Sequence, residues 1–175
     1  LDELMKQPVE HDNKTTFIKR GRYRGAIRFE NVTFSYPDSP QPALKDVSLE
    51  IAPGERVAVV GRVGSGKTTI GKMVTKLFVP DDGAIFIDGA DIRQLDPAEI
   101  RENIGLVSQE PWMIAGSVEQ NVILGAPNAG TEEMLWASEL AGVSDFVNRH
   151  PDGFKMTVAE RGEGLSGGQR QAISI

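Results

Sequence analysis

The sequence has no cysteine and only two histidines among its 175 residues. The absence of cysteine excludes a disulfide framework and any metal site that depends on thiolate ligands. His11 and His150 lie in polar stretches, and we assign a catalytic role to neither. No apolar run approaches the roughly 20 residues of a membrane-spanning helix, so the sequence itself contains no candidate span.

Basic residues are also in the minority, with 19 Lys and Arg against 25 Asp and Glu and a formal net charge of −6. Nucleic-acid-binding domains usually carry a basic surface, so nucleic acid is not expected as a partner. Hydrophobic residues make up 39% of the chain, which supports a packed core in one domain or a large part of one. The chain starts at Leu1 and stops at Ile175 within a helical pattern, so we interpret it as part of a longer protein.

The residues Gly61–Thr68 match the phosphate-binding loop pattern G-x-x-x-x-G-K-[ST]. The preceding residues 57–60 are apolar and mostly β-branched, which predicts a buried strand. Apolar residues after the loop recur at helical spacing and predict one helix face: Ile70, Met73, Val74, Leu77 and Phe78. Strand, loop and helix in this order are the context that the motif requires. A glycine-rich turn with an exposed lysine is the simpler alternative.

The composition of this loop suits a phosphate group. Glycine lets the backbone wrap around an anion, so that successive N–H groups and the helix N-terminus point at it. Lys67 can reach the β- and γ-phosphates of a nucleotide, and the Thr68 hydroxyl can ligate Mg²⁺. The predicted nucleotide-binding residues of this stretch are Gly61, Arg62, Val63, Gly64, Ser65, Gly66, Lys67, Thr68 and Thr69.

A second motif, Leu165-Ser166-Gly167-Gly168-Gln169, reads as the ATP-binding cassette (ABC) signature. The structural alternative is a helix start with Ser166 as N-cap and two flexible glycines. Both motifs, in this order, make the chain resemble the nucleotide-binding domain of an ABC transporter, and the resemblance covers nearly all of the sequence.

The resemblance implies roles for residues that are ordinary by themselves. Tyr36, at the end of a predicted edge strand, would usually only pack, but its position matches the aromatic residue that stacks on adenine. Gln109 would usually be a solvated loop residue, but it matches the glutamine that ligates Mg²⁺ or positions water. Lys67 and Gln109 are therefore the catalytic candidates in the chain, Thr68 and Gln109 are the metal candidates, and ATP and Mg²⁺ are the implied cofactors.

The resemblance also implies partners. ABC domains pair head to tail, so Leu165, Ser166, Gly167, Gly168 and Gln169 would close over ATP held by a second nucleotide-binding domain. Residues 1–24 resemble a linker from a preceding transmembrane domain. Thr157–Gly162 resembles the X-loop of exporters, with Ala159 where glycine is usual, and its charges would face that domain. The stretch 110–113 suits the same contact, although core packing of Trp112 is nearly as consistent with the sequence.

The family's Walker B strand, its catalytic glutamate, the D-loop and the switch histidine have no counterpart in the 175 residues and are expected after Ile175. The Walker B aspartate helps to hold Mg²⁺ and the glutamate activates water. We therefore expect these residues by themselves to show no ATPase activity.

We predict an α/β P-loop ABC ATPase with an antiparallel β-subdomain, a mixed central sheet and a helical subdomain over about 110–165, within a domain spanning 25–175. Predicted strands cover 26–36, with a break near Asn31, as well as 47–51, 57–60, 85–87 and 104–108. Helices are predicted to start at Asp96-Pro97, Ser117 and Thr131, the last of them ending at Gly142.

The implied function is ATP-driven export by a protein at the cytoplasmic face of the inner membrane, and the motifs look most like type I protein secretion. Peptide, lipid or drug export shares these features. A soluble ABC ATPase acting on DNA or ribosomes, or a nucleotide-binding fragment without activity, are alternatives of another class. The exported substrate would be contacted elsewhere in the protein.

Overall fold

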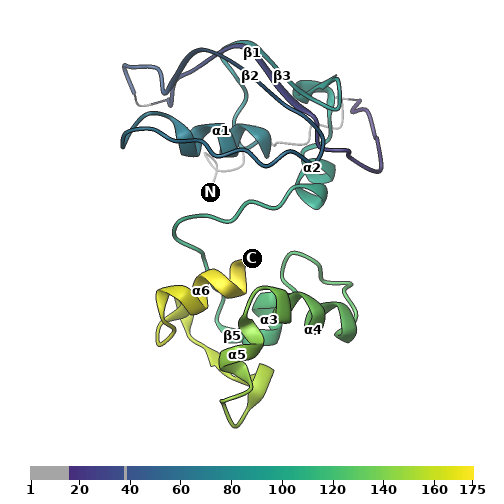
Figure 1. The fold of residues 1–175 in the computed structure, drawn as a ribbon, viewed down its shortest axis with the longest axis vertical. Coiled ribbons are helices and arrows are strands. Elements are labelled where there is room, and N and C mark those ends of the chain that lie inside the picture. Colours follow the sequence, from purple (N-terminus) through teal and green to yellow (C-terminus); the bar gives the residue numbers. More distant parts are fainter. Residues whose placement is uncertain (1–15, 38) are drawn as a thin grey trace, which may run out of the picture. The chain divides into compact units, whose positions relative to one another are not determined.

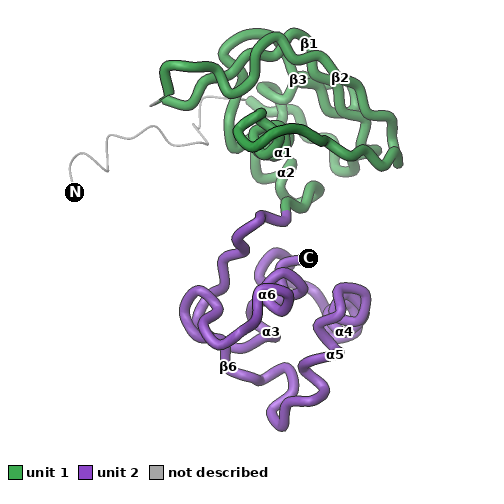
Figure 2. The backbone as a smooth tube through the Cα atoms, turned by 60° about the vertical axis from the view of Figure 1, so that its left-hand side comes forward, with its two compact units in different colours: residues 1–106 green, residues 107–175 purple. Residues whose placement is uncertain are grey.

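The computed structural model describes residues 16–37 and 39–175, which form two compact units (Figure 2). The first ends at Leu106 and the second covers Val107–Ile175. Residues 1–15 of the predicted linker over 1–24 lie outside the described residues. Among the described residues, no helix is both long and apolar enough to cross a membrane.

The first unit is built on an antiparallel sheet with the strand order β2-β1-β3-β4. The strands are β1 (Ile27–Phe34), β2 (Leu44–Ile51), β3 (Asp82–Ile87) and β4 (Ala90–Asp91). Helix α1 (Lys67–Val74) lies against this sheet, and α2 (Pro97–Asn103) follows a 3₁₀ turn over Ile92–Gln94 (Figure 1). Their shared core consists of Phe29, Val32, Phe34, Leu44, Met73, Ile85, Ile87, Ile92, Leu95 and Ile100. This sheet confirms the predicted antiparallel β-subdomain.

The predicted break in the first strand is a bulge at Asn31, whose φ is 49°. The register of β1 shifts there against both neighbouring strands. The Asn31 side chain donates to Asp46 Oδ1 at 2.8 Å. Gly83 of β3 approaches the bulge so closely that a Cβ would lie 2.3 Å from the Glu30 carbonyl oxygen. Only glycine fits there, so the bulge in β1 requires a residue without a side chain at this position of β3.

Two predicted strands, 57–60 and 104–108, carry no strand pairing in the described residues. Their apolar side chains are largely exposed, and Val60 retains 88% of its accessible surface. A buried strand needs ladder partners on its edges, and no described segment of the chain pairs with either stretch. Leu77, predicted on the buried helix face, is also exposed and lies beyond the end of α1 at Val74, whereas Phe78 packs against the core.

The second unit is mainly helical. It contains α3 (Val118–Val122), α4 (Thr131–Leu140), α5 (Val143–Val147), α6 (Gly167–Ser174) and a small β5–β6 ladder of Gly116–Ser117 with Thr157–Val158. Short 3₁₀ turns cover Gly153–Lys155 and Glu160–Gly162. Its core consists of Met113, Val118, Val143, Val147, Val158, Leu165 and Ile173.

The local helix signals act as predicted. Asp96 caps α2 with Pro97 in its first turn, and Ser117 caps α3 in a reciprocal pair with Gln120. Gly142, with a φ of 77°, follows the end of α4. Trp112, for which the sequence left two interpretations open, is 74% exposed and does not pack in the core, whereas Met113 does.

Candidate nucleotide-binding site

The loop Gly61–Thr68 lies ahead of α1 and wraps back on itself. Gly64 and Gly66 adopt left-handed φ values of 80° and 86°, and the Ser65 N–H donates to the Arg62 carbonyl at 3.2 Å. A Cβ on Gly66 would lie 2.5 Å from the Ala43 carbonyl oxygen and 2.7 Å from a Leu44 methyl group. The motif glycine is therefore required both for its φ and for close packing against the start of β2.

The Lys67 side chain forms hydrogen bonds with the backbone of its own loop. Its ammonium donates to the carbonyl oxygens of Gly61 at 3.0 Å and Arg62 at 2.7 Å. An ammonium group has three N–H donors, so these two bonds leave one for an anion. The lysine side chain therefore already lies over the loop that would surround a phosphate group.

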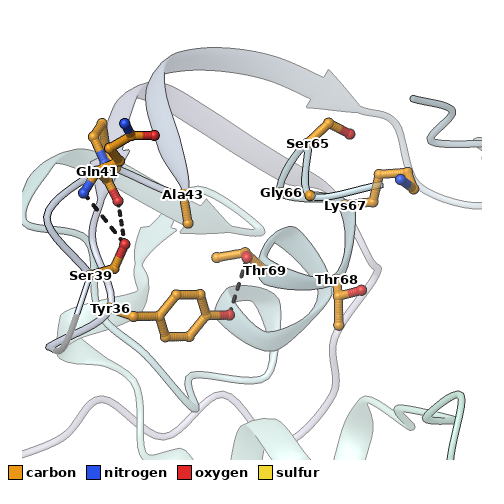
Figure 3. Close-up of a pocket in the computed structure, with 11 residues that line it drawn as sticks. Tyr36, Ser39, Gln41, Ala43, Ser65, Gly66, Lys67, Thr68 and Thr69 are labelled. Carbon is orange, nitrogen blue, oxygen red and sulfur yellow. Dashed lines mark hydrogen bonds between the residues drawn. The ribbon is translucent and has the colours of Figure 1, made fainter. Parts of the chain in front are cut away.

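Tyr36 lies at the same cavity, although it comes from the end of β1. Its hydroxyl lies 3.1 Å from Thr69 Oγ1 (Figure 3). Its ring packs edge-on with Phe34 and Phe78, with both centroid separations at 5.1 Å. The Lys72 ammonium lies 5.8 Å from the ring centroid. The structure thus brings together the predicted base-stacking residue and the predicted phosphate loop.

The cavity between them measures about 380 Å³, within the range usual for small-molecule sites. It is lined by Tyr36, Ser39, Gln41, Pro42, Ala43, Gly64, Ser65, Gly66, Lys67, Thr68 and Thr69. Left-handed glycines, exposed loop amides, one ammonium and an aromatic ring are the groups that a nucleotide's phosphates and base require. The residues present therefore fit a nucleotide.

Four residues of this lining were not predicted from the sequence: Ser39, Gln41, Pro42 and Ala43. Ser39 N–H donates to the Tyr36 carbonyl at 2.9 Å, and Ser39 Oγ donates to the Gln41 carbonyl at 2.9 Å. These bonds fold the loop between β1 and β2 over the cavity. The Pro-Asp-Ser-Pro run at 37–40 indicates a turn, which is the one signal that could have suggested it.

The signature residues form the start of α6. Ser166 Oγ accepts from the Gln169 N–H at 3.2 Å, and Gln169 Oε1 accepts from the Ser166 N–H at 2.8 Å. Gly167 and Gly168 are exposed in the first turn, and Leu165 is buried. The structural alternative, an N-cap with two glycines, is therefore locally correct, and it leaves the helix N-terminus open to an anion.

Gln109 does not line the cavity of the phosphate loop. It borders a second cavity, within the second unit, of about 480 Å³ that is lined by Gln109, Glu110, Pro111, Trp112, Arg161, Gly167 and Arg170. There the Arg161 guanidinium lies 5.5 Å from the Trp112 ring centroid. Arg161 has a left-handed φ of 60°. The X-loop stretch, the segment around Gln109 and the signature helix therefore meet around one cavity.

Arg170, which sequence reasoning missed, links two of these segments. Its Nη1 donates to the Leu165 carbonyl at 3.1 Å. A Cβ on buried Gly162 would lie 2.9 Å from both Arg170 Cδ and Met113 Cγ. The arginine therefore ties the signature turn to the end of the X-loop stretch, and no local sequence pattern signals such a contact.

Comparison with known proteins identifies the family. The model described as ABC transporter matches residues 44–175. The chain belongs to the ABC transporter family. Membership agrees with both motifs and with the ATPase fold predicted from them, and it implies ATP binding.

The curated relatives of this ABC transporter chain include ATP-binding proteins that are named for export or secretion. It is 38% identical to the leukotoxin export ATP-binding protein LtxB of Aggregatibacter actinomycetemcomitans, over 100% of this chain and 24% of that protein. It is 45% identical to the cyclolysin secretion/processing ATP-binding protein CyaB of Bordetella pertussis, over 87% of this chain and 21% of that protein. The chain thus spans about a quarter of the length of the relatives it matches.

A solved structure described as a bacterial Atm1-family ABC exporter with ATP bound is similar to this chain. The TM-score is 0.87 and the sequence identity is 34%, over 98% of this chain and 30% of that chain. The likeness confirms the predicted fold class.

Proposed function

We propose that this chain is the ATP-binding part of an ABC exporter that couples ATP binding and hydrolysis to transport across the membrane. The observation that carries the proposal is the single cavity that joins Tyr36 to the phosphate loop and Lys67. Adenine would stack on the Tyr36 ring, the loop amides and Lys67 would hold the phosphates, and the Thr68 hydroxyl would offer one oxygen ligand to Mg²⁺.

Type I protein secretion is the transport process that we propose. The relatives at 38% and 45% identity are named for export or secretion of leukotoxin and cyclolysin. This supports a protein as the exported substrate, in preference to a peptide, lipid or drug. The proposed location is accordingly the cytoplasmic face of the inner membrane.

Two partners follow from the proposal. A second nucleotide-binding domain would receive the signature start of α6, whose glycines are exposed. A transmembrane domain of the same protein would precede the linker at 1–24 and contact the cavity around exposed Trp112. Gln109 borders that cavity, so its proposed roles combine Mg²⁺ or water positioning with communication to the membrane domain.

Loss of the Lys67 ammonium tests the proposal. In the full-length protein, Lys67→Ala should weaken Mg-ATP binding by about 1.5–3 kcal/mol, the range for losing a hydrogen bond to a charged group. Isothermal titration calorimetry measures the change. Lys45→Ala, an exposed lysine on β2, is the matched control and should leave affinity unchanged. Equal affinities for wild type and Lys67→Ala would contradict the proposal.

A further inference from the structure

The hydrogen bond between Tyr36 and Thr69 connects two parts of the site that are 33 residues apart in sequence. Thr69 is the third residue of α1 and only 4% exposed. It directly follows Lys67 and Thr68, so the helical turn that presents the phosphate-binding groups also carries the hydroxyl that meets the tyrosine (Figure 3).

The remaining contacts of the Tyr36 ring are less directional. Phe34 and Phe78 pack against it edge-on, and Lys72 lies near its face. Apolar and aromatic packing of this kind limits the space available to the ring but tolerates tilting. A hydrogen bond has a narrow range of distance and angle. The Thr69 hydroxyl is therefore the group that fixes the position of the hydroxyl end of the Tyr36 side chain.

We propose that Thr69 is a positioning residue for the nucleotide base. Its hydroxyl holds the Tyr36 ring at a set distance from the phosphate loop, so that base stacking and phosphate binding reinforce one another. The inference rests on the proposed function, because it assumes that a nucleotide occupies this cavity. The alternative is that the Thr69 side chain contacts a phosphate directly. In that case the side chain would also strengthen the binding of a ligand that has phosphates but no base.

The test is a double-mutant cycle in the full-length protein. Thr69→Val keeps the shape of the side chain and removes the hydroxyl, and Tyr36→Phe removes the other hydroxyl. Each single variant should weaken Mg-ATP binding by up to about tenfold, with one neutral hydrogen bond as the upper limit, because the ring is then less well positioned before the nucleotide binds. The double variant should bind no more weakly than the weaker single variant, and Thr69→Ser should restore binding.

A matched control, Thr75, is the C-cap of the same helix. Thr75 is also 4% exposed, but among the described residues its hydroxyl bonds only to the helix carbonyls of Gly71 and Lys72. Thr75→Val should therefore leave ATP affinity unchanged, which separates positioning of the ring from general loss of a buried hydroxyl.

Inorganic tripolyphosphate with Mg²⁺ supplies the discriminating readout, because it has phosphates but no base. Calorimetry should show that Thr69→Val weakens ATP several-fold more than it weakens tripolyphosphate. Equal weakening of both ligands, or fold-changes that multiply in the double variant, would overturn the positioning role while leaving ATP binding intact. A wild-type protein that binds no ATP would overturn the proposed function itself.

Discussion

Asn121 and Ser138 are both buried polar residues of the second unit, but their surroundings differ. Asn121 Oδ1 accepts from the Ile114 N–H at 2.9 Å, and Nδ2 donates to the carbonyls of Ile114 and Ser117 at 3.0 and 2.9 Å. Ser138 on α4 is 1% exposed, and its hydroxyl has no hydrogen-bond partner among the described residues. The asparagine side chain therefore joins α3 to the segment that precedes it. The buried serine hydroxyl has lost its contact with water without gaining a hydrogen bond, which lowers the stability of the fold.

We expect Ser138→Ala to raise the free energy of unfolding by about 0.5–2 kcal/mol. The change removes an unsatisfied buried hydroxyl and introduces the residue with the highest helix propensity. Urea unfolding of the protein, followed by circular dichroism, measures the difference. Asn121→Ala provides the contrast and should destabilise by about 1–3 kcal/mol, because it leaves buried backbone groups unpaired. A destabilised Ser138→Ala would show that the hydroxyl has a partner after all.

At the scale of elements, residues 20–26, which we term the strap, are fastened to the first unit by two carboxylates. Glu99 Oε1 accepts the backbone N–H groups of Arg20 at 2.9 Å and Gly21 at 2.6 Å. Asp88 accepts those of Arg24 at 2.6 Å and Ala26 at 2.9 Å. The strap is therefore held both to α2, through Glu99, and to the end of β3, through Asp88.

The strap also perturbs two ionisable groups. The pKa of Glu99 is below its ordinary value of 4.5, mainly because the carboxylate accepts a hydrogen bond from the Gly21 N–H. The Tyr23 hydroxyl lies 3.3 Å from Glu99 Oε2. Burial, followed by the charge of Glu99, raises the pKa of Tyr23 to about 12. Tyr23 therefore remains a neutral hydrogen-bond donor to Glu99 at all physiological pH values.

Acid should loosen the strap. The folded pKa of Glu99 is below the unfolded one, so its stabilising effect is complete above pH 4.5 and is lost as pH falls through the folded value. Hydrogen exchange of the Arg20 and Gly21 amides, corrected for intrinsic rates, should rise over that range. In Glu99→Gln it should already be raised at pH 7, whereas Glu102→Gln, an exposed neighbour on α2, should match wild type. Equal protection in Glu99→Gln and wild type would contradict this account.

Elements with local signals could be predicted from the sequence, and those that depend on distant partners could not. The caps at Asp96, Ser117 and Ser166 were identified because the capping residue and the amide it bonds are close in sequence. The strand prediction for 57–60 was wrong for the described chain because a strand requires a neighbour that composition does not reveal. Glu99 lies in the first turn of α2, yet its carboxylate binds amides 78 and 79 residues away.

The candidate site also contains features that the sequence predicts and contacts that it does not. The phosphate loop and the signature follow fixed spacings, so their residues could be named from the sequence. The contact of Tyr36 with Thr69, and that of Arg170 with Leu165, depend on how the elements pack, and no spacing encodes them.

At the scale of the whole molecule, the phosphate loop and the signature belong to different compact units. Under the proposed head-to-tail pairing, the signature of one chain would complete the site of the other. Ser166→Arg in the full-length protein should then abolish hydrolysis, because a bulky cation at the start of α6 blocks closure sterically. ATP binding by a single chain should remain. Ser166→Ala loses the hydroxyl and the N-cap but adds no bulk, so it separates the steric block from loss of the hydroxyl and should retain more activity than Ser166→Arg.

Mixing Ser166→Arg chains with Lys67→Ala chains is the decisive form of this prediction. A mixed pair keeps one intact site, formed by the first chain's phosphate loop and the second chain's signature. ATPase activity should therefore partly return on mixing, if a single intact site suffices for turnover. Activity of Ser166→Arg chains by themselves at the wild-type level would show that Ser166 faces no nucleotide.

The exposure of Trp112 has a practical consequence for spectroscopy. The chain has two tryptophans, Trp112 and Trp136, and both indoles are largely exposed, at 74% and 68%. Trp112 also lies beside the Arg161 guanidinium. Both indoles belong to the second unit, so the intrinsic fluorescence of these residues reports on that unit alone. Coverage of the cavity around Trp112 by another protein surface would shift this emission to shorter wavelength, with no attached dye.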